Sequence, residues 1–581
     1  MLKQKHLLFF LLFATFISLI IIVWSMNKGF NLSDEGYYIT GYNNLIEFPF
    51  WLSAFHYLTN NTLTYIGSGI IFFRLARLLL TIAGSIFLSY TLFGLLKKFN
   101  FVKKANEKTT LIALSLFGII GTFAGYGLGP QALSYNHYTL IFGDLFLGLI
   151  FLAFTNSQNI KKNLIISGAL GIISGLEFFV KIPTTLLLSV LFICVQVLLF
   201  KQIRWFSFLN SMIYSFFAIL SFSLISFPTS PIQVLNEYTD VITFVSKFYT
   251  HDINHVIYNY KIGFLDFWSC HLVNYVPGLL YLIIAFVISI QNRFEKLKPI
   301  GRFLLLFVIL SMVYSFYKQG YFLSGSKHNS TAPLIYIALL FLFSILYIST
   351  KTKTIIHTDF LLEKAFVVLS LLFLPFICAL GTGNYLHVQI LFFLNTWFLF
   401  IYLVYTFSGL EKFNFNISIS ILLITLTVKS IVDVFTGLVV DPYKINGHLW
   451  EQTEPLKIQS TNETIYIDKE LMNTIKTLQP IIESENPDAL FTSSQLIGLS
   501  YIFNKKLIGY AWYDSGISPK EFFVESYNKS TLKEKNKICF MLLSAENNYK
   551  IVDHLSDKKT NTQLITLPWE NDSIFIYSRH N

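Results

Sequence analysis

Two adjacent carboxylates, Asp34 and Glu35, are the strongest local signal for chemistry in this sequence. They lie in the segment Asn31-Leu-Ser-Asp-Glu-Gly-Tyr-Tyr38, just after the first long hydrophobic stretch. A carboxylate at a membrane surface can act as a general base that deprotonates an acceptor hydroxyl. The same pair can instead mark a helix start, where Ser33 or Asp34 caps the first turn and Glu35 favours the helix dipole. The sequence alone leaves both interpretations open.

Four basic residues are candidate ligands for a donor phosphate. Arg74 and Arg77 are three residues apart near the start of the second hydrophobic stretch, so they share a helix face. Lys181 lies between two apolar stretches, and Lys327 lies in the loop Ser324-Gly-Ser-Lys-His-Asn329. Guanidinium and ammonium groups at a membrane boundary can bind a phosphate, although contact with lipid headgroups explains them equally well.

Three further residues are candidate substrate contacts. Tyr37 follows the carboxylate pair, whereas Asn136 and His137 lie in Leu133-Ser-Tyr-Asn-His-Tyr138, a segment without an acid. Asp144 lies about 10 Å deeper, at 1.5 Å per residue along a helix. Asn and His side chains can bind sugar hydroxyls, but they can also satisfy polar groups at a helix end.

No cofactor is indicated with certainty, and no metal ligand is assigned. A divalent metal held by His137 with Asp34 and Glu35 is left open, because sequence separation gives no geometry. The four cysteines have no zinc-like spacing.

The composition indicates a membrane protein. Of 581 residues, 54% are hydrophobic and only 13% are charged, against roughly 25% charged in soluble domains. This excludes an ordinary cytosolic enzyme, a disordered chain and a disulfide-stapled secreted domain. Residues 441–581 hold 15 Lys/Arg against 18 Asp/Glu. The basic excess therefore belongs to residues 1–440, and a nucleic-acid partner is not indicated.

Thirteen hydrophobic stretches recur along residues 1–440, and a membrane-spanning helix needs about 20 apolar residues. They are 7–26, 75–96, 110–127, 138–155, 163–180, 183–200, 207–227, 268–290, 303–322, 332–349, 365–381, 388–407 and 416–436. We therefore expect a polytopic α-helical membrane protein with about thirteen transmembrane helices. Its long outer loops are expected at 27–74 and 228–267.

The distribution of Lys and Arg sets the expected topology. Loops on the side of the N-terminus hold 19 of them, and the opposite loops hold 8. The positive-inside rule then places the N-terminus in the cytoplasm and the C-terminal domain outside. The richness in Asn, Lys, Phe and Ile is typical of AT-rich bacterial genomes, so we expect the bacterial inner (cytoplasmic) membrane, in the cell envelope.

Residues 441–581 are predicted to form a small soluble α/β domain. Strands are expected at 464–468, 489–492, 537–543 and 573–577, and helices at 469–482 and 494–503. The segments Asp441-Pro-Tyr-Lys444 and Trp512-Tyr-Asp514 attract attention as aromatic residues beside carboxylates, but no role is assigned to them.

Two ion pairs and one turn are expected within residues 1–440. Glu177 and Lys181 are four residues apart, as are Lys429 and Asp433, and this spacing favours pairing on a helix. The segment Gly381-Thr-Gly-Asn-Tyr-Leu-His387 is interpreted as a tight turn between helices.

In the segments that hold Asp34, Arg77 and Lys181, the sequence resembles lipid-dependent membrane glycosyltransferases of the GT-C type, such as protein O-mannosyltransferases and the aminoarabinose transferase of lipid A. The Asp-Glu pair after the first helix is similar to the family signature. The Arg77-Leu-Leu-Leu-Thr-Ile-Ala-Gly84 run and the stretch Gly171–Lys181, ending Phe-Phe-Val-Lys, are similar to two further family segments.

The resemblance implies that Asp34 is the catalytic base, that Arg77 and Lys181 bind the donor phosphate, and that transfer is inverting. The donor would be a polyprenyl-phosphate sugar, and the acceptor a lipid, a glycan or a protein. Many family members have a second acid where this chain has the segment 133–138, which leaves the acceptor open. A lipid-linked glycan transporter or flippase, or a glycan polymerase or ligase, remains an alternative. A transporter would show polar groups near the midplane and repeated halves. Here the charges cluster at the outer boundary, Asp144 and Glu177 come closest to intramembrane charges, and no internal repeat is evident.

Overall fold

The computed structural model describes the chain in separate ranges. They are residues 4–46, 55–102, 104–156, 159–200, 205–226, 236, 239–240, 243, 257–258, 260–262, 361–381, 386–407, 416–513, 520–529, 537–543, 564–569 and 572–580. The hydrophobic stretches predicted at 268–290, 303–322 and 332–349 lie outside these ranges, as do Lys327 and most of the predicted loop 228–267.

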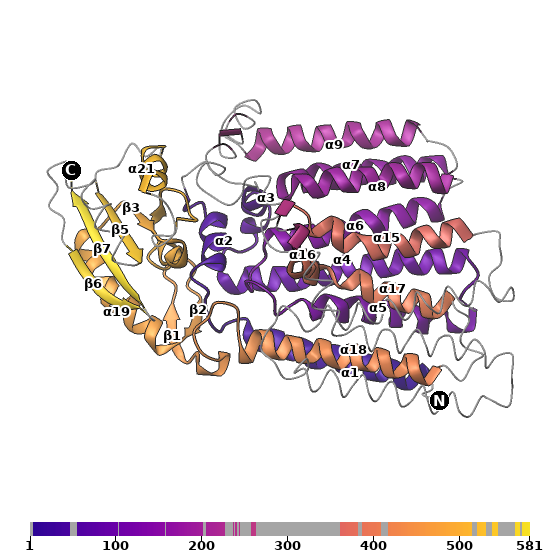
Figure 1. The fold of residues 1–581 in the computed structure, drawn as a ribbon, viewed down its shortest axis with the longest axis horizontal. Helices are drawn as coiled ribbons and strands as arrows, with labels where there is room; N and C mark the ends of the chain where they lie inside the picture. Colours follow the sequence, from indigo (N-terminus) through magenta and orange to yellow (C-terminus); the bar gives the residue numbers. More distant parts are fainter. Residues whose placement is uncertain are drawn as a thin grey trace.

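Long apolar helices lie side by side in a bundle, and a smaller α/β domain sits at one end of it (Figure 1). The bundle helices are α1 (Gln4–Ser25), α4 (Ile70–Lys98), α5 (Glu107–Ala124), α6 (Tyr135–Thr155), α7 (Ile160–Val180), α8 (Ile182–Phe200), α9 (Trp205–Ser226), α15 (Leu361–Ala379), α17 (Asn395–Phe407) and α18 (Asn416–Phe435). Among the described residues, five of them (α1 and α4 to α7) are long and apolar enough to cross a membrane, by length and composition. The helical membrane class follows from these elements, but they do not confirm the count of thirteen.

The nearly continuous apolar stretch 163–200 forms two helices, as its sequence predicts. Lys181 is the extended residue between α7 and α8, and Pro183 occupies the first turn of α8. Proline suits a first turn because its fixed φ is helical and its missing N–H would have no partner there. The break places Lys181 at the end of the bundle that faces the α/β domain.

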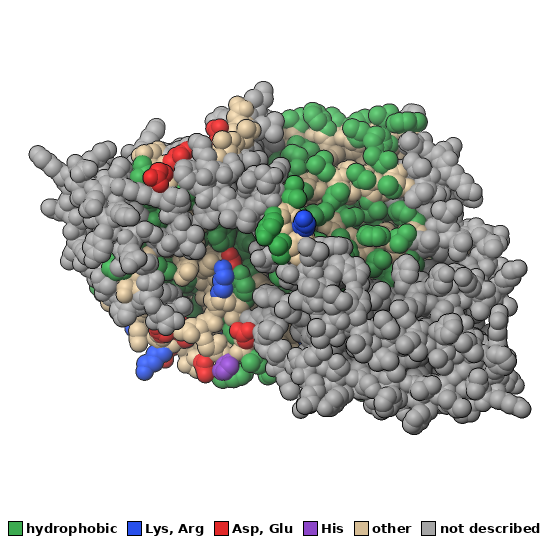
Figure 2. Space-filling view, in the orientation of Figure 1, with side chains coloured by type: hydrophobic (Ala, Val, Ile, Leu, Met, Phe, Trp, Pro, Cys, Tyr) green, Lys and Arg blue, Asp and Glu red, His purple; other side chains and the backbone are tan. Residues whose placement is uncertain are grey.

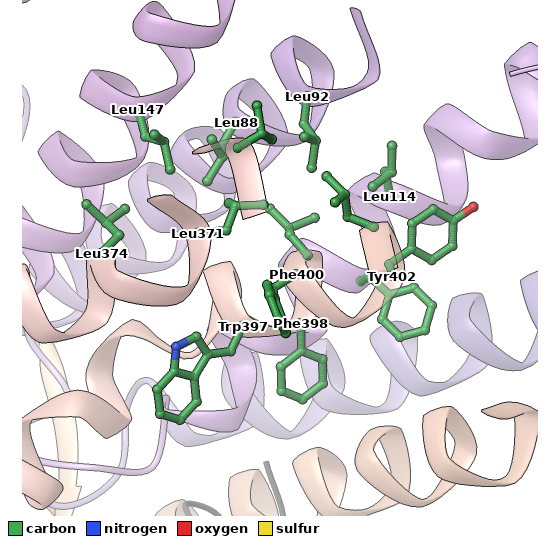
Figure 3. Close-up of a cluster of buried hydrophobic side chains, with 14 of the residues drawn as sticks. Leu88, Leu92, Leu114, Leu147, Leu371, Leu374, Trp397, Phe398, Phe400 and Tyr402 are labelled. Atoms are coloured by element: carbon green, nitrogen blue, oxygen red, sulfur yellow. The ribbon is translucent and has the colours of Figure 1, made fainter. Parts of the chain in front are cut away.

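Interlocking leucine and aromatic side chains hold the bundle together (Figure 3). The cluster takes Leu88 and Leu92 from α4, Leu114 from α5, Leu147 from α6, Leu371 and Leu374 from α15, and Trp397, Phe398, Phe400 and Tyr402 from α17. Lipid tails are as apolar as leucine, so close packing and not burial from water joins such helices. Gly118 of α5 shows how close the approach is, because a Cβ there would lie 2.5 Å from the Ser85 hydroxyl of α4.

Large apolar side chains are exposed on the outside of the bundle. Phe9 and Phe16 of α1 are 72% and 61% exposed, and Phe216 of α9 is 63% exposed. Figure 2 shows green side chains gathered over the upper helices of the bundle. A continuous apolar surface of this kind marks contact with a membrane or a partner, and along helices this long and apolar it fits hydrocarbon.

The α/β domain has a five-stranded sheet in the order β4-β3-β5-β7-β6. Its strands are β3 (Ala489–Thr492), β4 (Lys506–Leu507), β5 (Lys537–Leu543), β6 (Leu564–Trp569) and β7 (Asp572–His580); β3 is parallel to β4 and β5, and β7 is antiparallel to its neighbours. A hairpin of β1 (Glu454–Lys457) and β2 (Thr464–Ile467) precedes helix α19 (Lys469–Glu485), and α20 (Gly498–Ile502) and α21 (Lys520–Lys529) follow. The predicted α/β character is confirmed, and each predicted strand or helix has its counterpart.

The chain between α1 and α4 connects the two parts. It holds helix α2 (Asp34–Tyr42), the short helix α3 (Phe55–Asn60) and a 3-10 turn at Leu63–Tyr65. Four backbone hydrogen bonds among the described residues tie it to the α/β domain: Gly29 N to Tyr466 O at 2.7 Å, Tyr466 N to Asn27 O at 2.8 Å, Gly498 N to Leu32 O at 2.7 Å, and Leu507 N to Leu45 O at 2.6 Å. Gly36 of α2 meets Gly498 so closely that a Cβ would lie 2.6 Å from its backbone. The α/β domain is therefore held by contacts with this connection as well as by its covalent link to α18.

The carboxylate of Glu463 joins the α/β domain to the start of α4. Its two oxygens accept the N–H groups of Ile70 at 2.6 Å and Ile71 at 3.1 Å. Such caps contribute about 0.5–2 kcal/mol. We expect Glu463→Ala to speed hydrogen exchange of the Ile70 and Ile71 amides about fivefold, as measured by mass spectrometry. Glu451→Ala is the matched control, because the Glu451 carboxylate accepts the N–H of His448 within the same domain and no N–H of α4. Equal effects of the two variants would contradict the capping role.

Cys539 lies within β5 and provides a probe of folding. Burial raises the pKa of its thiol to about 12, so the reactive thiolate is scarce at pH 8. In a variant without Cys194, Cys270 and Cys378, we expect iodoacetamide to react about 1000-fold more slowly than with the unfolded chain. Ser484→Cys, on the exposed face of α19, is the accessible control. Rapid labelling of the native protein at Cys539 would show that the sheet is not formed.

Candidate active site

Asp34 and Glu35 open α2, but their side chains have different surroundings. Ser33 occupies the N-cap position without a side-chain capping bond. Glu35 is fully buried, whereas the side chain of Asp34 is 13% exposed. Residues adjacent on a helix project about 100° apart. One carboxylate therefore faces the bundle and the other faces the α/β domain, and the helix-capping alternative does not describe Asp34.

Glu35 forms a two-pronged ion pair with Arg74. Arg74 Nε donates to one carboxylate oxygen at 2.8 Å and the terminal Nη2 donates to the other at 2.7 Å. The remaining N–H groups of Arg74 reach the carbonyls of Met26, Lys28 and Gly29 at 2.7–2.9 Å. A buried pair of guanidinium and carboxylate groups with these contacts fixes α4 relative to α2 and to the segment 26–29. The structure therefore gives both residues a supporting role beside the site.

Arg77 is equally buried and organises the turn between α5 and α6. Its terminal nitrogens donate to the carbonyls of Tyr126 at 2.7 Å and Pro130 at 2.9 Å. Its guanidinium lies 3.8 Å from the centre of the Tyr126 ring. Cation–π stacking and bonds to the carbonyls of Tyr126, Pro130 and Gln131 engage the terminal nitrogens of the group that the sequence offered to a phosphate. Its Nε has no hydrogen-bond partner among the described residues.

Lys181 ends α7 and is 4% exposed. Its ammonium donates to the carbonyl of Cys378 on α15 at 2.7 Å and lies 5.6 Å from the centre of the Tyr135 ring. Glu177 accepts a bond from Thr139 at 2.9 Å. Lys181 and Glu177 therefore do not form the ion pair expected from their spacing. Lys181 bonds to α15 instead, and Glu177 bonds to α6. The other expected pair, Lys429 with Asp433, is present.

Tyr37, Asn136 and His137 lie at the same end of the bundle and are buried. The Tyr37 ring lies 4.9 Å from that of Trp512 of the α/β domain, centre to centre. His137 Nδ1 contacts the Ser134 hydroxyl at 2.8 Å and accepts the Ser134 N–H at 3.0 Å, which caps α6. Among the described residues Asn136 Oδ1 has no hydrogen-bond partner. His137 Nδ1 thus satisfies the helix end. His137 Nε2, which also has no hydrogen-bond partner among the described residues, and the Asn136 oxygen have unused capacity for a ligand.

The contacts of Asp34 come from a segment about 400 residues away. Tyr443 donates its phenol proton to Asp34 Oδ2 at 2.7 Å, and Lys444 Nζ lies 3.0 Å from the same oxygen. Burial, and next the charge of Asp34, raise the pKa of the Tyr443 phenol, so this group stays protonated and continues to donate. Sequence analysis noted the segment Asp441–Lys444 but assigned it no role, and its contact with Asp34 is tertiary.

Oδ2 of Asp34 accepts both contacts, whereas Oδ1 has no hydrogen-bond partner among the residues that the structure describes. A carboxylate held through one oxygen keeps the other available to receive a proton. Figure 2 shows acidic and basic side chains in the band between the bundle and the α/β domain. Two aromatic rings lie between Asp34 and Lys181. The ring centres of Tyr38 and Tyr135 are 6.5 Å apart, and the Lys181 ammonium lies 5.6 Å from the centre of the Tyr135 ring.

The metal set left open by the sequence is not assembled. Within the described ranges no group of three or more His, Cys, Asp or Glu side chains is placed to hold a metal ion. Glu35 is paired with Arg74, and His137 Nδ1 is bonded to Ser134. Most of the turn expected at 381–387 lies outside the described ranges. Gly381, which is described, has a φ of +92° that suits glycine, and its N–H donates to the Tyr260 hydroxyl at 2.6 Å.

No family model and no curated protein matches the sequence. The fold has a likeness to three structures of the oligosaccharyltransferase of Archaeoglobus fulgidus, named as complexes with zinc and sulfate, with a tethered acceptor peptide, and, as AglB, with an inhibitory peptide and a dolichol-phosphate. Identities are 11–12%, TM-scores are 0.44–0.46, and the matches cover 92–100% of this chain and 68–74% of the others.

Proposed function

We propose that this chain is a membrane glycosyltransferase of the GT-C type. It moves a sugar from a polyprenyl-phosphate donor to an acceptor hydroxyl at the membrane surface, and Asp34 is the general base. The observation that carries this proposal is the position of Asp34 where the bundle meets the α/β domain. Its Oδ2 is held by Tyr443 and Lys444, whereas Oδ1 has no hydrogen-bond partner in the described ranges. The resemblance of the Asp-Glu segment to the family signature supports the same assignment.

In the proposed reaction Asp34 Oδ1 takes the proton of the acceptor hydroxyl as its oxygen attacks the anomeric carbon. A new carbon–oxygen bond forms, and the bond from that carbon to the donor phosphate breaks with the electron pair remaining on the phosphate. Attack opposite the leaving phosphate inverts the anomeric centre. The departing phosphate gains one negative charge, so the site needs a cation beside it.

The test is sugar transfer by the full chain reconstituted in lipid. The donor panel contains polyprenyl-phosphate sugars, and the acceptors are extracted cell-envelope lipids, glycans and a peptide. The assay is run with and without a chelator, because the sequence leaves a divalent metal open. We expect one donor to be consumed and the product to have the opposite anomeric configuration by NMR.

Two results would overturn this proposal. If wild type and Asp34→Asn consume the donor equally, the base lies elsewhere. If neither consumes a donor but both carry lipid-linked glycans across the vesicle membrane, the protein is a transporter.

A further inference from the structure

The linker that enters the α/β domain lies directly on the start of α2. It follows α18 and a π-helical turn at Thr436–Val440. The carbonyl of Tyr443 accepts a bond from Asn31 at 3.2 Å, and Lys444 Nζ lies 3.3 Å from the Ser33 hydroxyl as well as 3.0 Å from Asp34. The linker therefore supplies a cation to the carboxylate that the proposed function makes the base.

Lys444 is more accessible than the three candidate phosphate-binding cations that the structure describes. Arg74, Arg77 and Lys181 are 1–4% exposed, and each donates to backbone carbonyls. The Lys444 side chain is 48% exposed. An ammonium group has three N–H donors, and two of them point to Asp34 and Ser33. The third remains for a ligand that arrives from the membrane surface.

The backbone at Lys444 argues against an incidental surface ion pair. Its φ is +50°, in the left-handed region, which costs a residue with a Cβ about 1–2 kcal/mol. An exposed ion pair returns only about 0.2–1 kcal/mol. The other non-glycine residues with positive φ in the described ranges are all asparagine: Asn44, Asn100, Asn462, Asn486 and Asn504. Lysine at this position is thus unfavourable for stability alone, and strain of this kind accumulates at functional positions.

We propose that Lys444 binds the donor phosphate, and that Tyr443 is a positioning residue that keeps Asp34 beside it. This inference rests on the proposed function. When the sugar–phosphate bond breaks, the phosphate gains a negative charge at the moment Asp34 is neutralised by the acceptor proton. The Lys444 ammonium then transfers its contact from Asp34 Oδ2 to the leaving phosphate. The ammonium thus moves from a carboxylate that loses its negative charge to a phosphate that gains one.

The test measures binding and does not require turnover. Farnesyl phosphate is titrated into the full chain in lipid nanodiscs, and farnesol, which lacks the phosphate, is titrated in parallel. We expect Lys444→Gln to weaken farnesyl phosphate binding about tenfold to a hundredfold, as loss of a charge-assisted hydrogen bond does, with farnesol unchanged. Lys444→Arg should retain most of the affinity. Lys97→Gln is the matched control, because Lys97 is a 47% exposed lysine paired with Glu107 at the other end of α4.

A second variant keeps the inference falsifiable if Lys444→Gln does not fold. Asp34→Asn removes the negative charge that competes with the phosphate for the Lys444 ammonium, so it should tighten farnesyl phosphate binding. This gain should disappear in the double variant with Lys444→Gln. Unchanged farnesyl phosphate affinity in both single variants would overturn the assignment while the proposed function stands. If wild type binds farnesyl phosphate no better than farnesol, the lipid-phosphate donor itself is wrong and the proposed function fails with it.

Discussion

Asp34→Asn is expected to lower the rate of sugar transfer about 10²–10⁴-fold, the usual contribution of a positioned general base. Asparagine has nearly the same shape as aspartate. Its carbonyl oxygen can still accept from Tyr443 and Lys444, which contact Oδ2 in the native protein. The amide then stands where Oδ1 stood, and an amide NH₂ donates hydrogen bonds but takes no proton at neutral pH. The measurement is donor consumption at saturating donor and acceptor.

The controls separate loss of the base from loss of the fold. Asp488→Asn removes an exposed carboxylate of the α/β domain and should leave the rate unchanged. Cys539 in the Asp34→Asn protein should stay as slow to label as in wild type. Tyr443→Phe removes one contact to Asp34 but leaves the carboxylate, so its loss should be smaller. A rate for Asp34→Asn within twofold of wild type would end the assignment of this residue as the base.

The local elements could be predicted because their signals are local. An apolar run of about 20 residues indicates a helix of bundle length, and Lys181-Ile-Pro183 marks the break between α7 and α8. Strands such as β5 follow from short apolar runs between polar segments. Docking of the α/β domain on residues 27–46 could not be predicted, since backbone hydrogen bonds such as Leu507 to Leu45 leave no mark on side-chain type.

The candidate site was predicted in part, and the limits have a geometric cause. The Asp-Glu pair stands out as a pattern, but only the orientation of α2 decides that Glu35 meets Arg74 and Asp34 does not. Arg74 and Arg77 share a helix face, yet the carbonyls that they bind belong to two different turns. Lys444 contacts Asp34 although about 400 residues separate the two in the sequence. A contact over that separation leaves no periodic pattern in the sequence. Sequence analysis could therefore note the segment with Lys444 but could not predict its contact with Asp34.

Arg74→Met is expected to destabilise the protein by about 3–5 kcal/mol, the usual result of leaving a buried charge without its partner. Glu35 would remain buried as an unpaired carboxylate, and the carbonyls of Met26, Lys28 and Gly29 would lose their donor. Glu35→Met should cost less, because the guanidinium keeps those carbonyls. The measurement is the free energy of unfolding in mixed lipid and detergent micelles titrated with SDS, with Cys539 labelling as the readout.

The double variant separates a structural ion pair from a phosphate ligand. If Arg74 and Glu35 support each other, the double Met variant should be more stable than the sum of the single losses predicts, because no charge stays buried alone. Sequence spacing instead suggested Arg74 as a donor-phosphate ligand. In that case Arg74→Met would keep its stability and lose farnesyl phosphate binding, whereas Glu35→Met would change neither. The structure predicts the first outcome, because Arg74 is 1% exposed and its N–H groups already meet protein acceptors. A phosphate could bind this guanidinium only by displacing a carboxylate and the backbone that joins α1 to α2.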